Sequence, residues 1–121
     1  MSFFLKTRPL LAAMAIASLY GCANDPAPNE QLKLTEQAVA QAAAVGATDD
    51  EQDMAAARAK LAQAQADMTD KSYKDARMQA EQAELDARLA EARVLTQKSN
   101  EQLTQVNARL DRLRKQLGAA Q

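Results

Sequence analysis

The sequence predicts an all-α protein: an alanine-rich hairpin of two to three helices, extended by a long coiled-coil-like helix at the C-terminal end. Two observations support this fold class. Alanine, glutamine, glutamate, lysine and arginine, all good helix formers, dominate the chain after Cys22. Apolar residues in that part recur at spacings of three and four, the helical period. The length allows one domain at most, and we place a helical domain over residues 30–117.

The first predicted helix covers residues 30–45. Its weak apolar stripe consists of Leu32, Thr35, Val39 and Ala42. Gly46 follows directly, and glycine is typical of the position just past a helix C-terminus.

The second predicted helix covers residues 49–68. Thr48 and Glu51 have the spacing of a capping box at its start. One face carries Met54, Ala57, Leu61, Ala64 and Met68, and a second face carries only alanines, at 55, 59, 62 and 66. Residues 69–72 are expected to form a turn, with Ser72 as the N-cap of the next helix.

The third predicted helix covers residues 72–117 and is followed by a frayed tail, 118–121. One face of its first half carries Tyr73 and a row of small residues: Ala76, Ala80, Ala83, Ala87, Ala90 and Val94. Met78, Leu85, Leu89 and Ala92 lie almost on the opposite side. Because alanine lets two backbones approach closely, we expect the second helix to pack antiparallel against the first half of the third, with the first helix nearby.

The second half of the third helix carries a heptad pattern that we call the C-terminal seam: Leu103, Val106, Leu110, Leu113 and Leu117. Thr96 and Ser99 are polar interruptions before it. No other segment has a length that matches this half helix. The seam is therefore expected to bind a helical partner, either another protein or a second copy of the chain.

The N-terminal segment, residues 1–21, is typical of a signal peptide. Lys6 and Arg8 precede an uncharged apolar run over residues 9–19, which is too short to span a membrane. Leu19, Gly21 and Cys22 resemble a lipobox, the cleavage signal of bacterial lipoproteins. The resemblance implies a covalent lipid, an N-acyl and an S-diacylglycerol group, on Cys22. Residues 22–29, with Pro26 and Pro28, are then a lipidated tether, and Ala23 favours anchoring in the outer membrane, facing the periplasm.

The composition argues against an enzyme and against a metal or cofactor site. The chain has no histidine and a single cysteine, and its three glycines are isolated from one another. We therefore expect no catalytic residue, no metal site, no cofactor and no small-molecule substrate. With 15 basic and 16 acidic residues and no basic block, it lacks the electrostatic footprint of a nucleic-acid-binding protein.

Residues 32–93, with their regular alanine spacing, resemble a family of small periplasmic lipoproteins classed as a domain of unknown function (DUF4398-like). The resemblance implies a location in the cell envelope and no activity. The sequence favours a lipid-anchored helical adaptor or spacer in an envelope complex. The alternatives are a self-assembling structural lipoprotein without a covalent link to peptidoglycan, and a surfactant-like or ligand-binding lipoprotein.

Overall fold

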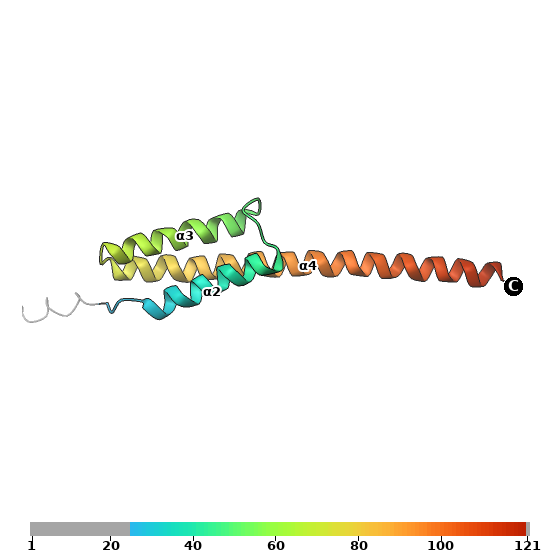
Figure 1. The fold of residues 1–121 in the computed structure, drawn as a ribbon, viewed down its shortest axis with the longest axis horizontal. Coiled ribbons are helices and arrows are strands. Elements are labelled where there is room, and N and C mark those ends of the chain that lie inside the picture. The colour runs from blue at the N-terminus through green and yellow to red at the C-terminus, as the bar shows by residue number, and fades with distance from the viewer. Residues whose placement is uncertain (1–24, 121) are drawn as a thin grey trace, which may run out of the picture.

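The computed structural model describes residues 25–120, which form three α-helices and no strand. These are α2 (Asn29–Val45), α3 (Gln52–Thr69) and α4 (Tyr73–Ala119). The first half of α4 packs against α2 and α3, and its second half projects alone (Figure 1). α2 runs parallel to α4, and α3 runs antiparallel to both. The predicted all-α fold, the hairpin and the long C-terminal helix are confirmed.

Glycine ends α2 but does not end α4. Gly46 takes the left-handed conformation, with φ of 107°, and its N–H and that of Ala47 donate to the carbonyls of Ala43 and Ala42. Gly118 does not take a positive φ, and α4 continues through it to Ala119. α4 therefore extends two residues beyond its predicted end at residue 117, because a glycine stops a helix only where it adopts that conformation.

The start of α3 differs from the predicted capping box. Only half of the box forms: the Thr48 backbone N–H donates to Glu51 Oε2 at 3.0 Å, but no side chain caps the helix. The Glu51 N–H donates to the Thr48 carbonyl at 3.1 Å, so residues 48–51 are a turn and α3 begins at Gln52 rather than Asp49. Ala47 is buried in the core. Residues 48–50, which follow it, are exposed, so the chain leaves the core before α3 starts.

The turn between α3 and α4 falls where it was predicted. α3 ends at Thr69 and α4 begins at Tyr73. Lys71 takes a positive φ of 60°, a conformation that a lysine seldom adopts. Ser72 is the residue before α4 as expected, although its side chain makes no capping hydrogen bond.

The core consists mainly of alanine. The face of α4 predicted to be small is buried from Ala76 to Val94, while Tyr73 at its start is half-buried. α3 contributes Met54, Ala57 and Ala64, and α2 contributes Thr35, Ala38 and Ala42. Each alanine removes only about one methyl group from water, worth roughly 0.8 kcal/mol. The second face of α3, predicted from alanines alone, is exposed.

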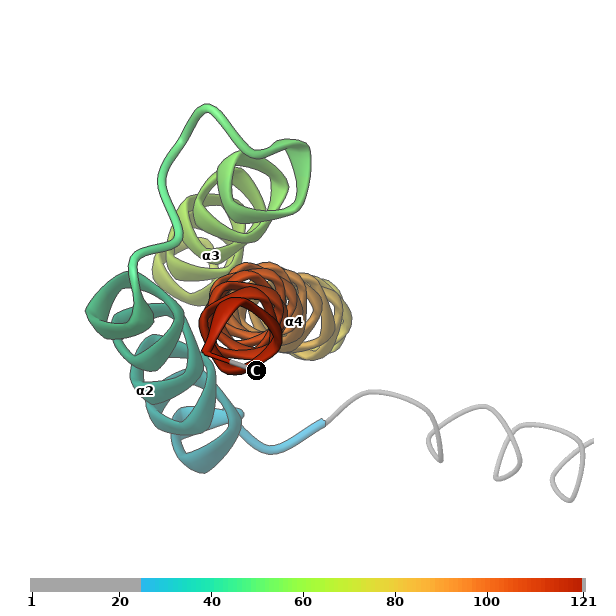
Figure 2. The same cartoon turned by 90° about the vertical axis from the view of Figure 1, so that its right-hand side faces the viewer.

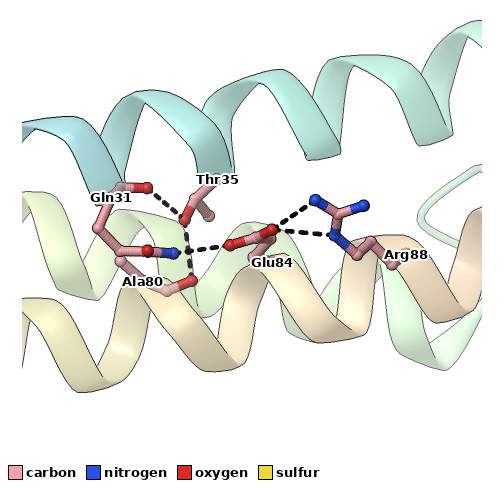
Figure 3. A network of polar contacts seen from close by, with 5 residues as sticks. All are labelled: Gln31, Thr35, Ala80, Glu84 and Arg88. Atoms are coloured by element: carbon pink, nitrogen blue, oxygen red, sulfur yellow. Dashed lines mark hydrogen bonds and ion pairs between the residues drawn. The ribbon is translucent and has the colours of Figure 1, made fainter.

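A polar network joins α2 to α4 near the start of the bundle (Figure 3). The Thr35 hydroxyl is fully buried and lies 2.9 Å from the carbonyl oxygens of Gln31 and Ala80. Gln31 Nε2 donates to Glu84 Oε2 at 2.7 Å, and the Arg88 guanidinium donates to Glu84 Oε1 at 2.6 and 2.9 Å. The hydrogen bond from Arg88, followed by that from Gln31, lowers the pKa of the Glu84 carboxyl below its ordinary value of 4.5.

Further polar contacts fix the register of the three helices. Lys60 on α3 pairs with Asp86 on α4 at 2.7 Å, and Arg93 on α4 pairs with Asp53 on α3. At the end of the bundle, Lys98 Nζ donates to the carbonyl of Val45 at 2.5 Å. The last turn of α2 has no basic residue of its own. Lys98 of α4 instead places a positive charge beside the negative C-terminal end of α2, which is a favourable interaction.

We expect Ala87→Leu to lower the free energy of unfolding by about 1–3 kcal/mol, because the larger side chain has no space where α4 meets its neighbours. Ala62→Leu is the matched control, since Ala62 is an exposed mid-helix alanine of α3 and its replacement should change stability by less than about 0.5 kcal/mol. Urea unfolding of the full chain, followed by circular dichroism, measures both. Equal effects would contradict the packing described here.

The Glu84 network makes stability depend on pH. Because the pKa of Glu84 is lowered in the folded protein, its contribution to stability is fully present only above the ordinary pKa of 4.5 that the unfolded carboxyl has. That contribution is lost as the pH falls through the lower folded value. At pH 7 we expect the free energy of unfolding of wild type to exceed that of Glu84→Gln by about 1 kcal/mol. This difference in the free energy of unfolding should shrink at pH 3. A difference that is equal at both pH values would refute the argument.

Candidate interaction surface along α4

The C-terminal seam is exposed along its whole length. The five side chains from Leu103 to Leu117 retain between 43% and 70% of their accessible surface. All lie on the part of α4 that extends beyond α2 and α3, where every residue from 95 to 120 is exposed. The structure thus places the predicted residues on one helix face and gives them no partner among the described residues.

The same apolar face continues back into the bundle. Met78, Leu85 and Leu89 are 47%, 67% and 43% exposed, although they belong to the packed half of α4. Their spacing places them opposite the buried alanine face of α4, and Figure 2 shows α2 and α3 together on one side of that helix. We call this surface, which Gln82 interrupts between its first two members, the outer stripe: Met78, Leu85, Leu89, Ala92, Thr96, Ser99 and the five seam residues.

The two faces of α4 change differently where the bundle ends. The buried alanine face turns polar after Val94, and Glu101, Gln105 and Arg112 occupy its continuation. The outer stripe stays apolar to Leu117, apart from Thr96 and Ser99. The Thr96 hydroxyl donates a hydrogen bond to the Ala92 carbonyl of the same helix, at 2.7 Å. The projecting half of α4 therefore has a single apolar face, and it is the one that the bundle leaves uncovered.

The projecting half of α4 is also basic. Residues 103–117 hold four bases and one acid, a net charge of +3. The bases are Arg109, Arg112, Arg114 and Lys115. Arg114 lies 3.5 Å from Asp111, but both side chains are exposed, and such pairs contribute little to stability.

The predicted lipobox lies outside the described residues, so Leu19, Gly21 and Cys22 have no structural placement. Of the predicted tether over residues 22–29, the structure describes residues 25–29. Pro28 is buried, and the Arg77 guanidinium donates to the Pro26 carbonyl at 3.3 Å. From Pro26 onward the chain is therefore fixed to the start of α4.

The described residues offer little else that resembles a site. They contain no group of acidic, cysteine and histidine residues able to hold a metal ion. One hollow, between Leu89 and Gln105, is lined by α4 alone, so it is an open groove rather than a cavity. None of the helices described over residues 25–120 is long and apolar enough to cross a membrane.

Comparison with known proteins agrees with the sequence resemblance. The family model named Domain of unknown function (DUF4398) matches residues 30–106. No protein of curated function is significantly similar to the chain. The crystal structure of a DUF4398 family protein from Pseudomonas aeruginosa PAO1 is 61% identical, with a TM-score of 0.77, and the match covers 79% of this chain and 100% of that one. The chain therefore belongs to the DUF4398 family.

Proposed function

We propose that this protein is an outer-membrane lipoprotein, anchored through Cys22, that acts as a periplasmic helical adaptor or spacer. The observation that carries the proposal is the exposed seam on a helix that projects from its own bundle. A row of leucines at heptad spacing on a solvated helix is typical of a helix that binds another helix. The proposed role involves no catalysis.

The position of the tether gives this arrangement a direction. The Pro26 carbonyl binds Arg77 at the start of α4, and Pro26 is the fourth residue after Cys22. Four residues span at most about 14 Å. A lipid on Cys22 therefore keeps the tether end of the bundle next to the bilayer, and the seam lies at the far end of α4. At 1.5 Å per residue, the 47 residues of α4 extend about 70 Å.

Self-assembly is the second candidate role, and one observation favours it. The outer stripe runs along both halves of α4, so the helix presents an apolar face longer than the seam that an adaptor needs. The mass of the crosslinked product described below separates the two roles.

The anchor is tested by expressing the full chain and Cys22→Ser in a Gram-negative cell supplied with a clickable fatty acid. We expect the label on wild type and none on Cys22→Ser. Wild type should enter the detergent phase on Triton X-114 partition and the outer-membrane fraction on a density gradient. Unlabelled wild type, or a labelled variant, would refute anchoring at Cys22.

The seam is tested by photo-crosslinking in cells from a probe at Arg109, beside Leu110. Leu110→Asp should lower the yield of the product more than tenfold, because an apolar contact cannot accept an unpaired carboxylate. Ala108→Asp is the matched control: it adds the same charge on the opposite, polar side of the helix and should leave the yield unchanged. A yield that is insensitive to Leu110→Asp removes the seam from the proposal.

A further inference from the structure

The outer stripe has an internal symmetry that indicates its own partner. It extends from Met78 to Leu117, and its polar members, Thr96 and Ser99, lie near its middle. Reversing the helix about the midpoint between Gln97 and Lys98 superposes every member of the stripe except Leu113 on another member. The pairs that then face each other are Met78 with Leu117, Leu85 with Leu110, Leu89 with Val106, Ala92 with Leu103 and Thr96 with Ser99.

This match follows the geometry of an antiparallel two-helix contact. In the heptad that the seam defines, each facing pair joins an a position to a d position, so all the apolar side chains meet at one interface. The overlap covers more than five heptads, whereas three to four suffice to indicate a coiled coil. Leu113 is the one seam residue that meets a polar side chain, that of Gln82.

The charges of the two halves are complementary in the same register. Residues 78–92 hold four acids and one base, a net charge of −3, and face residues 103–117, with four bases and one acid and a net charge of +3. Asp86 and Glu84 already pair with Lys60 and Arg88. Glu81 lies exposed between Met78 and Leu85, beside the stripe.

A parallel pair lacks this complementarity. In a parallel pair, each segment of net charge −3 faces the same segment of the other copy, and so does each segment of net charge +3. Arg109 of one copy then lies next to Arg114 of the other, at positions where coiled coils usually place opposite charges. Like charges there destabilise the contact.

The bundle leaves the outer stripe accessible for this contact. α2 and α3 occupy the alanine side of α4 (Figure 2), and Leu85, at the centre of the packed half, is 67% exposed. A second copy can therefore lie along the whole stripe without displacing any helix.

We propose that two copies of this protein pair antiparallel along the outer stripes of their α4 helices, with the basic end of each helix lying against the bundle half of the other. The inference rests on the proposed role of the seam as an association surface, and it names the first partner of that surface as a second copy.

The test uses the full chain, in which the lipid is expected to occupy the thiol of Cys22, and two differently tagged single variants, Gln82→Cys and Leu113→Cys. The variants are expressed together in cells and oxidised in the periplasm. We expect a disulfide-linked dimer that carries both tags and no dimer from either variant alone, because 31 residues, about 45 Å, separate the two Leu113 positions. Ala108→Cys, on the polar side, should not link to Gln82→Cys.

A further variant separates the inference from the seam alone. Leu85→Asp lies in the bundle half, 25 residues before Leu110, and we expect it to lower the yield of the mixed dimer at least tenfold. Circular dichroism should show unchanged helicity because the residue is exposed. A mixed dimer that persists in Leu85→Asp would overturn the extended contact.

The remaining outcomes decide between this inference and the proposed function. A dimer of Leu113→Cys with itself means parallel pairing, which overturns the inference and keeps the seam. If no cysteine pair forms a disulfide but the probe at Arg109 captures a different envelope protein, the proposed pairing with a second copy is wrong and the adaptor proposal is supported. If neither experiment gives a product, both proposals fail.

Discussion

Small side chains from Ala76 to Val94 on one face of α4 lie directly against α2 and α3. This contact sets the arrangement of every other element. It lets three backbones approach closely, but each alanine buries little area, so the stability of the bundle depends on the fit of many small contacts and on polar contacts that fix the register. Lys60 with Asp86 and the buried Thr35 hydroxyl are two of these contacts.

The packing of small side chains also explains why α4 has a second apolar face that the bundle leaves uncovered. Small residues occupy the packed side of α4. Its larger apolar side chains lie on the opposite side, which the bundle does not cover. An ordinary surface helix carries polar residues there. In this protein the extra face extends over both halves of α4, and it becomes the sole apolar face once the alanine side turns polar after Val94. The fold thus separates the face that builds the bundle from the face that we propose for association.

The proposed anchor and the proposed pairing together restrict the orientation of the assembly. The Pro26 carbonyl accepts a hydrogen bond from Arg77 at the start of α4, so a lipid on Cys22 would lie near that end of its own helix. In the antiparallel pair, those two ends are about 60 Å apart. Both lipids can enter one bilayer only if the paired rod lies along the membrane surface. A single copy bound to a different partner is free to extend away from the membrane instead.

The sequence by itself determined the helical class, the buried alanine face of α4, the end of α2 at Gly46 and the seam, because each depends on periodicity or on a single conformational preference. Only the tertiary structure decided three other features. α3 begins at Gln52, after a turn over residues 48–51 that follows the buried Ala47, and Pro28 in the predicted tether is buried. The Ala55 face of α3 is exposed although its composition equals that of the packed faces. Alanine is compatible with either environment, so the packing of neighbouring helices, rather than local sequence, selects which alanine face is buried.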